Sequence, residues 1–396
     1  MKIVQIGGAL NGAQKIIEEA IHHRAIEQGH ESYIFYACGK SDEPGIIKYE
    51  NRFENLLTRA LRKYVGTRTC YSALQTSRLI RKIESIQPNI IHLHVLHHGY
   101  TDYMMLFKYL VKEQIPVVYT MHDMWAFTGG CYHFRSLNCA GFQTGCGNCQ
   151  CLPNLLDTTL TNVTEEWKKK KELFEKVRNL NIVAVSAWVA EEVRRGFLAQ
   201  FPISVIPNGV LQCNRDKPLP NCAPDKKFQI ICVAASWTKE KGIDILLKLA
   251  KLLSDEAELL LVGGVADEML AKAPSNIRFY GYCSDREKLF DLYRMATIHV
   301  SASLEETYGM TFVEAALAGT RSVGFASTAI EETLQGVYGV AVEQFTAYAL
   351  RDAIITIKQE KKGKLSIKEI ECVADRYSVI IMADKYLSLY EKIMRG

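Results

Sequence analysis

The sequence predicts an α/β protein built from two parallel-sheet domains in series. Short apolar runs alternate with helical patterns along the chain, one Pro- and Asn-containing stretch interrupts this alternation, and 396 residues are enough for two domains. Apolar residues make up 48% and charged residues 23%, which excludes wholesale disorder. The net charge of +4 is too small to indicate nucleic-acid binding.

The first half of the chain contains five expected strands and three expected helices. The strands are apolar runs of four or five residues at 2–6, 32–36, 90–94, 117–121 and 182–185. The helices repeat apolar residues every three or four positions at 12–29, 53–65 and 78–86. Gly29 and Pro88 are the expected stop signals of the first and third helices.

The alternation pauses at 207–227, where prolines and polar residues indicate a linker, and then restarts. The later expected strands lie at 229–233, 259–262, 277–280, 298–301 and 321–325. We therefore expect Rossmann-like domains at 1–212 and 226–376, with a helix in 377–396 that crosses back to the first domain. Ligands of such sheets bind at the carboxyl ends of the strands, so a central cleft that both domains face is the expected site.

The stretch 301–320 contains the most informative motif. A strand ends near Ser301, a glycine-containing loop follows, and a helix begins near Gly309, where free backbone N–H groups favour phosphate oxygens. Glu306 and Glu314 have seven residues between them. The alternative interpretation is an ordinary strand-to-helix turn with solvated acids.

This stretch resembles the E-x7-E signature of retaining glycosyltransferases of family 4, which have the two-domain GT-B fold. Further resemblances occur in the family's order at Gly7-Gly8 and Gly12-Ala13, His92 and His94, Thr120–Asp123, Ile206–Val210, Lys241-Gly242 and Gly263-Gly264. Two positions depart from the family pattern: Asn89 replaces a common Asp, and Ser236 replaces a common Arg. The Trp-containing version at 235–238 is similar to exopolysaccharide and colanic-acid-type bacterial transferases.

The resemblance implies a role for each motif residue. The implied donor-binding residues are Gly8, Gly12, Ser236, Lys241, Gly309, Met310, Thr311 and Glu314. Lys241 and the first helical N–H groups would stabilise the departing diphosphate, and Glu314 would bind the ribose. His122 and Glu306 are the implied catalytic residues, both directed at the donor sugar. The resemblance also implies a hexosyl transfer without a catalytic metal or other required cofactor, and the sequence contains no Asp-x-Asp signature.

The expected activity is transfer of a sugar, with retention, from a UDP- or GDP-sugar to a glycan or lipid-linked saccharide in surface polysaccharide biosynthesis. Two alternatives stay open: a nucleotide-sugar 2-epimerase of the same architecture, and a non-catalytic transferase-like subunit. The first residues read as a buried strand and not as a signal peptide, and no apolar run approaches 18 residues. We therefore expect a cytoplasmic protein.

Three further features carry open interpretations. Five cysteines lie within 21 residues, and Cys131, Cys139, Cys146 and Cys149 predict either a structural zinc site or plain thiols. The histidines at 92, 94, 97 and 98 favour acceptor-side hydrogen bonding or structure over a metal site. The basic amphipathic segment 53–65 either packs on its own sheet or contacts the inner membrane surface, as a lipid-linked acceptor would favour.

Overall fold

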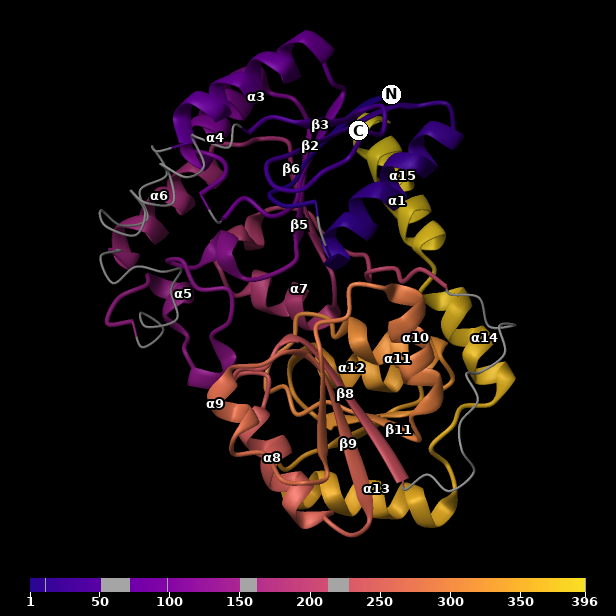
Figure 1. Cartoon of the computed structure of the whole chain (residues 1–396). Helices are drawn as coiled ribbons and strands as arrows, with labels where there is room; N and C mark the ends of the chain where they lie inside the picture. The colour runs from indigo at the N-terminus through magenta and orange to yellow at the C-terminus, as the bar shows by residue number, and fades with distance from the viewer. Residues whose placement is uncertain (11, 51–71, 98, 150–161, 213–227, 396) are drawn as a thin grey trace. The chain divides into compact units, whose positions relative to one another are not determined.

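The computed structural model describes residues 1–10, 12–50, 72–97, 99–149, 162–212 and 228–395. The chain divides into two compact units (Figure 1): unit 1 is Met1–Gly209 with Val379–Gly396, and unit 2 is Val210–Ser378. The predicted segment 53–65, Cys151 and most of the predicted linker lie outside the described residues.

Unit 1 contains a parallel sheet of seven strands in the order β3-β2-β1-β4-β5-β6-β7. In chain order the strands are β1 (Lys2–Ile6), β2 (Glu31–Tyr36), β3 (Ile46–Lys48), β4 (Ile90–Leu93), β5 (Val117–Met121), β6 (Leu180–Ala184) and β7 (Ile203–Val205). The central strands β4 and β5 are buried at every residue, which explains their continuous apolar sequence.

The helices of unit 1 include one from the far end of the chain. They are α1 (Gly12–Glu27), α3 (Ala73–Ile86), α4 (Tyr103–Glu113), η2 (Trp125–Phe127), η3 (Arg135–Leu137), α5 (Gly141–Thr144), α6 (Val163–Glu175), α7 (Ala187–Arg194), η5 (Phe197–Gln200) and α15 (Val379–Arg395). Helix α15 lies beside α1 (Figure 1), where Arg24 Nε donates to Asp384 Oδ1 at 2.7 Å. Tyr386 and Tyr390 of α15 are fully buried in the core of this unit.

Unit 2 contains a parallel sheet of six strands in the order β10-β9-β8-β11-β12-β13. The strands are β8 (Phe228–Ser236), β9 (Ala257–Gly264), β10 (Ile277–Gly281), β11 (Ile298–Val300), β12 (Ser322–Phe325) and β13 (Val340–Val342). The helices are α8 (Ile243–Leu252), α9 (Asp267–Leu270), α10 (Arg286–Met295), α11 (Met310–Leu317), α12 (Thr328–Gly336), α13 (Ala347–Glu360) and α14 (Ile367–Arg376). Helices α8 and α13 contact each other and contribute to one apolar core with β8 and β9.

The strand order of each sheet reverses at one point. In unit 1 the reversal falls between β1 and β4, and in unit 2 between β8 and β11. Loops that leave neighbouring strands at such a point diverge and leave room for a ligand at the carboxyl ends of the strands. The loops after β1, β4, β8 and β11 are therefore the structural candidates for binding.

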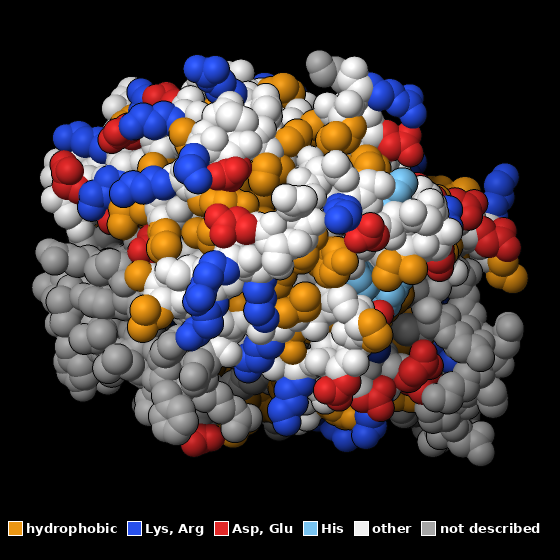
Figure 2. All heavy atoms as spheres, turned by 90° about the horizontal axis from the view of Figure 1, so that it is seen from above, with side chains coloured by type: hydrophobic (Ala, Val, Ile, Leu, Met, Phe, Trp, Pro, Cys, Tyr) orange, Lys and Arg blue, Asp and Glu red, His pale blue; other side chains and the backbone are white. Residues whose placement is uncertain are grey.

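The surface carries charges of both signs. On the face drawn in Figure 2, Lys and Arg side chains are interspersed with Asp and Glu and with apolar side chains. No helix in the described residues combines the length and the apolar composition needed to cross a membrane.

Candidate functional site

In unit 2, the loops after β8 and β11 are in direct contact. Gly242 has φ +73°, and a Cβ placed on it would lie 2.0 Å from the carbonyl oxygen of Ala302. Only glycine fits this position, because it needs both a left-handed backbone and the absence of a side chain. The backbone N–H of Leu304 also donates to the carbonyl of Glu240 at 3.2 Å. The predicted Lys-Gly and E-x7-E motifs thus form one structural site.

Lys241 and Glu306 form an ion pair across this contact. Lys241 Nζ lies 2.5 Å from Glu306 Oε1, and the two side chains are 33% and 23% exposed. The backbone N–H of Glu306 donates to Thr328 Oγ1 at 3.1 Å, which fixes the loop at that residue. Lys241 and Glu306 come from two separate sequence motifs, and the structure pairs the ammonium of one with the carboxylate of the other.

Helix α11 begins directly after this loop. Its N-terminal cap is Gly309, with φ +86°, and a Cβ there would lie 2.7 Å from the ring of Phe312. The N–H groups of Met310 and Thr311 stand in the first turn, where no preceding helical carbonyl can accept from them. This end of α11 has the geometry that favours a bound phosphate group.

Glu314 lies in the second turn of α11, in a mostly buried position. Its carboxylate has two partners: Arg286 Nη1 at 3.7 Å from Oε1, and the hydroxyl of Tyr293, which donates to Oε2 at 3.5 Å. Burial raises the pKa of Glu314, and Arg286 and Tyr293 partly offset that rise. Neither partner was singled out in the sequence, because both lie on α10 and carry no motif.

Ser236, where the family commonly has Arg, ends β8 and is exposed. It lies beside Gly264 in the register of β8 and β9. The next residue, Trp237, is buried, and its backbone N–H donates to the carbonyl of Gly264 at 2.8 Å. Its indole Nε1 is buried and has no hydrogen-bond partner among the described residues.

In unit 1, the two predicted glycines have different surroundings. Gly8 follows β1 and is closely packed, since a Cβ there would lie 3.1 Å from the carbonyl oxygen of Val95, just after β4. Gly12 begins α1 with φ +55°, and open space surrounds the position of its missing Cβ. A ligand can therefore approach the backbone at Gly12, whereas Gly8 serves the packing of the two loops.

His122 follows β5 and takes part in a chain of hydrogen bonds through the core. Its Nε2 lies 3.0 Å from Nδ1 of His94, whose Nε2 lies 3.2 Å from Oε1 of Gln5. The amide nitrogen of Gln5 donates to the carbonyl of Glu18 at 3.0 Å. The predicted His94 and His122 are thus in direct contact, which sequence spacing did not indicate.

This chain of hydrogen bonds determines which ring nitrogens of His94 and His122 carry a hydrogen. Because the amide nitrogen of Gln5 donates, its Oε1 must accept, so Nε2 of His94 carries a hydrogen. Burial lowers the pKa of His94 well below its usual value and that of His122 to about 4, so both rings are neutral near pH 7. Nδ1 of His94 therefore accepts from Nε2–H of His122. His122 consequently has an unprotonated Nδ1.

Of the remaining histidines of the group, His92 and His97 have partners in unit 1, and His98 lies outside the described residues. His92 lies between Thr120 Oγ1, 2.7 Å from its Nε2, and the hydroxyl of Tyr390, 2.6 Å from its Nδ1. His97 Nε2 lies 3.4 Å from Asp123 Oδ2. No group of three or more His, Cys, Asp or Glu within the described ranges is arranged to hold a metal ion.

Glu18 is a functional candidate that the sequence analysis missed. It is fully buried beneath the first loop, where a Cβ on Gly7 would lie 2.3 Å from its Oε1. Gln14 donates to Oε1 at 2.6 Å, and Oε2 has no partner among the described residues. Burial raises the pKa of Glu18 to about 8, so it is mostly protonated at neutral pH. The sequence signal for its burial was its spacing from Ile21 and Ala25, which places Glu18 on the buried face of α1.

Comparisons with known proteins connect both units to one enzyme family. Residues 11–210 match the family model Glycosyltransferase Family 4, and residues 227–360 match the model for glycosyl transferases group 1. The chain is 24% identical over 345 residues, 82% of each chain, to the putative colanic acid biosynthesis glycosyl transferase WcaC of Escherichia coli.

A second relative matches over a shorter region. It is the N,N'-diacetylbacillosaminyl-diphospho-undecaprenol alpha-1,3-N-acetylgalactosaminyltransferase of Campylobacter jejuni, 27% identical over 178 residues, which are 43% of this chain and 46% of that one.

Solved structures share the fold at low sequence identity. Sucrose-phosphate synthase from Thermosynechococcus elongatus aligns over 100% of both chains with a TM-score of 0.72 and 15% identity. Anabaena HepE, solved in complex with UDP and glucose, aligns over 99% of this chain and 100% of that one with a TM-score of 0.64 and 15% identity. Together with the two parallel sheets, these likenesses confirm the predicted GT-B fold.

Proposed function

The chain belongs to glycosyltransferase family 4, and from this premise we propose that it transfers a sugar from a nucleoside diphosphate sugar to a hydroxyl group of a saccharide acceptor. The observation that carries the proposal is the meeting of Lys241 and Glu306 at the strand-order reversal of unit 2, next to the start of α11.

The charge distribution of this site suits a diphosphate leaving group. As the glycosidic bond breaks, the departing nucleoside diphosphate gains negative charge, and fixed positive groups stabilise that charge. Lys241 and the first-turn N–H groups of α11 supply them in this chain. A bound diphosphate competes with Glu306 for the ammonium of Lys241, and the carboxylate is then released toward the hydroxyl groups of the donor sugar.

Glu314 accepts hydrogen bonds from the ribose hydroxyls in this proposal. Its contacts with Arg286 and Tyr293 orient the carboxylate before the nucleotide binds. Arg286 also favours the ionised form, which is the better hydrogen-bond acceptor, against the effect of burial. Either UDP or GDP meets these requirements.

His122 acts on the donor sugar near the bond that breaks. A neutral imidazole with an unprotonated Nδ1 is a hydrogen-bond acceptor and adds no positive charge beside the sugar. The transfer proceeds with retention, and the charge on the diphosphate is neutralised by protein groups without a catalytic metal ion.

The acceptor is a saccharide of a surface polysaccharide, either a growing glycan or a lipid-linked saccharide. The names of the two curated relatives support this proposal: one is assigned to colanic acid biosynthesis, and the other to a diphospho-undecaprenol-linked substrate. With a lipid-linked acceptor, the enzyme would work at the cytoplasmic face of the membrane.

The test is a donor panel assayed with and without acceptor. Purified full-length protein is incubated with UDP- and GDP-hexoses and with undecaprenyl-diphosphate-linked saccharides, in buffer without added Mg²⁺ or Mn²⁺. The expected result is an acceptor-dependent product whose new linkage keeps the anomeric configuration of the donor, seen by NMR. Conversion of the donor sugar without acceptor would indicate an epimerase instead. Absence of nucleotide binding across the panel would contradict the proposal.

A further inference from the structure

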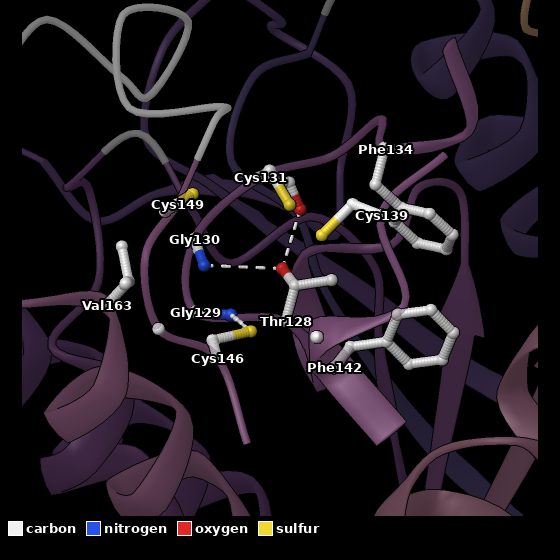
Figure 3. Close-up of a pocket in the computed structure, with 12 residues that line it drawn as sticks. Thr128, Gly129, Gly130, Cys131, Phe134, Cys139, Phe142, Cys146, Cys149 and Val163 are labelled. Carbon is white, nitrogen blue, oxygen red and sulfur yellow. Dashed lines mark hydrogen bonds between the residues drawn. The ribbon is translucent and has the colours of Figure 1, made fainter. Parts of the chain in front are cut away.

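The four cysteines near the end of β5 line one small pocket in unit 1 (Figure 3). Its volume is about 20 Å³, which is room for one water-sized sphere. The sulfur atoms come from three stretches of chain: Cys131 after a glycine pair, Cys139 just before α5, and Cys146 with Cys149 in one turn. The rest of the wall is largely apolar and includes Phe134, Phe142 and Val163.

The backbone brings these stretches together through small residues. A Cβ on Gly129 would lie 2.5 Å from the carbonyl oxygen of Val163 and 3.0 Å from Cβ of Cys146, so only glycine allows this approach. The N–H of Gly129 donates to Sγ of Cys146 at 3.1 Å. Asn148, with φ +45°, turns the chain between Cys146 and Cys149. A short Cys-x2-Cys turn of this kind is typical of thiolate metal sites.

The surrounding segment has little regular structure to stabilise it. Within residues 122–149, its helices are η2 and η3 with three residues each and α5 with four. A metal cross-link would add to the stability that its buried side chains, such as Phe127, Phe134 and Phe142, already provide. The described cysteines, these four included, are thiols and not disulfides.

A buried lysine, Lys170, adjoins the pocket, and burial lowers its pKa to about 7. The ammonium of Lys170 donates to the carbonyls of Trp125 at 2.8 Å and Thr128 at 3.1 Å, and it interacts electrostatically with Cys131 and Cys146. Four thiolates around a divalent cation have a net charge of −2. That negative charge would favour the protonated form of Lys170, which would then partly neutralise it.

We propose that Cys131, Cys139, Cys146 and Cys149 bind one zinc ion, and that this ion stabilises the segment following His122. The side chains in the described part of the chain do not form a coordination shell as they stand. Ligation therefore requires the thiols to rotate inward about their Cα–Cβ bonds. Each thiol loses its proton to solvent, and four Zn–S bonds form without a redox step.

The proposed site is structural, because four protein ligands leave no position for a substrate. One hydrogen bond joins the residue after Cys131 to the turn that follows β5, and a second holds that turn in place. The N–H of Met124 donates to the carbonyl of Tyr132 at 3.3 Å, and the N–H of Trp125 donates to Asp123 Oδ1 at 2.8 Å. Loss of the ion should therefore loosen the segment between Asp123 and Cys149.

Metal analysis of the full-length protein is the first test. Protein purified without chelator should contain about one zinc per chain. The double variant Cys146→Ser/Cys149→Ser should contain almost none. Cys232→Ser is the matched control, because that thiol is buried in unit 2 and should keep the zinc content unchanged.

Two measurements on the wild-type chain cover the case in which the double variant does not fold. Cobalt(II) in place of zinc should give the visible bands of a tetrahedral thiolate complex. The four cysteines should react with iodoacetamide much faster after chelation than before, as mapped by mass spectrometry. Substoichiometric zinc together with no cobalt bands, or equal alkylation with and without chelator, would overturn the proposal.

Discussion

The two strand-order reversals of the molecule have opposite electrostatic character. In unit 1, three buried groups at and beside the reversal are neutral: His94 and His122 are uncharged near pH 7, and Glu18 is mostly protonated. In unit 2, the corresponding loops hold the ion pair of Lys241 and Glu306, which water partly reaches. The same sheet topology therefore supports two different kinds of site.

This difference fits two separate roles in the proposed transfer, one for each unit. Buried neutral groups form hydrogen bonds of fixed direction, which suits the orientation of an uncharged sugar. A partly exposed ion pair can exchange one partner at low cost, which suits the arrival and departure of a charged diphosphate. The following experiments test this comparison from the largest expected effect to the smallest.

Acid should destabilise unit 1 before unit 2. Burial lowers the pKa of His92, His94 and His122 in unit 1, whereas unit 2 has only His299, whose pKa is lowered to about 3. Such groups stabilise the fold above their unfolded pKa near 6.5, and this contribution is lost as the pH falls toward the folded value. For His122 alone, with a pKa of about 4, the loss is roughly 3 kcal/mol. Glu18, whose pKa is raised to about 8, contributes roughly 3 kcal/mol in the opposite direction between pH 7 and 4.5, so the net loss in unit 1 depends on His92 and His94 as well.

Hydrogen exchange, corrected for the intrinsic pH dependence of the rate, checks this prediction. Between pH 7 and pH 4.5, peptides from β4 and β5 should lose protection before peptides from β8 and β11. In the variant His122→Gln, the protection of β5 from hydrogen exchange should depend less on pH. Equal loss of protection in both units would contradict the proposed difference.

Replacement of Lys241 should have the largest effect on catalysis. Lys241→Ala removes the main cation that we propose for the diphosphate and leaves the carboxylate of Glu306 in place. We expect turnover to fall by about 100- to 1000-fold, as for loss of one group that stabilises a developing anion. Steady-state kinetics measure the effect. Lys239→Ala is the matched control, since Lys239 is exposed two residues away, and a similar loss in that variant would argue against a specific role of Lys241.

Glu314→Ala should weaken binding of the free nucleotide and of the nucleotide sugar equally. Loss of a charge-assisted hydrogen bond costs roughly 1.5–3 kcal/mol, which is about ten- to hundredfold in affinity. Isothermal titration calorimetry with UDP and GDP measures the effect. Because Arg286 would lose its partner, melting temperature must be measured in parallel. If the folded variant binds nucleotide with unchanged affinity, the ribose does not bind at Glu314 of α11.

Much of the fold is predictable from the sequence, because the long buried strands and the helices between them have distinct periodicities. The three-residue edge strands β3, β7 and β13 were not predicted, since such short runs show no period. They form only because the neighbouring strand supplies hydrogen-bond partners.

The candidate site was predictable as a set of residues but not as a set of contacts. The motifs indicated Lys241 and Glu306, 65 positions apart, yet only the packing of Gly242 on Ala302 brings their loops together. Arg286 has no motif and becomes relevant only because α10 lies beside α11. Tertiary contacts of this kind leave no periodic signal in a single sequence.

Gln5→Leu should lower turnover through His122, although Gln5 has no proposed contact with the substrate. Without the amide acceptor, Nε2 of His94 loses its partner, and the ring can shift its hydrogen to Nδ1, which then cannot accept from His122. Loss of one such hydrogen bond is worth about 1 kcal/mol, or about fivefold in turnover, with little change in the Michaelis constant for the donor.

Nitrogen NMR of histidine-labelled protein reports the tautomer directly. His122 should carry its hydrogen on Nε2 in the parent and exchange between tautomers in the variant. Gln75→Leu is the control, because Gln75 is equally buried in unit 1 and donates to the carbonyl of Tyr100. If both variants lose the same activity, Gln5 has only a packing role.

Of these variants, Glu306→Gln should change nucleotide affinity the least. It should raise that affinity, whereas Glu314→Ala should lower it. In the structure without donor, Glu306 holds the ammonium of Lys241, so removing its charge makes that ammonium more available to a diphosphate. A partly exposed ion pair is worth about 0.2–1 kcal/mol, which predicts UDP or GDP binding tighter by about 1.5- to 5-fold. Turnover should nevertheless fall, because the carboxylate no longer accepts from the donor sugar in the transition state.

Calorimetry and steady-state kinetics on the same preparation separate the two effects of Glu306→Gln. The gain in affinity should shrink at high salt, since screening weakens the interaction of Lys241 with both the carboxylate and the diphosphate. Glu305→Gln is the neighbouring control, and it should not tighten nucleotide binding. Weaker nucleotide binding by the folded Glu306→Gln variant would show that Glu306 does not compete with the diphosphate, and the exchange of partners proposed for unit 2 would be wrong.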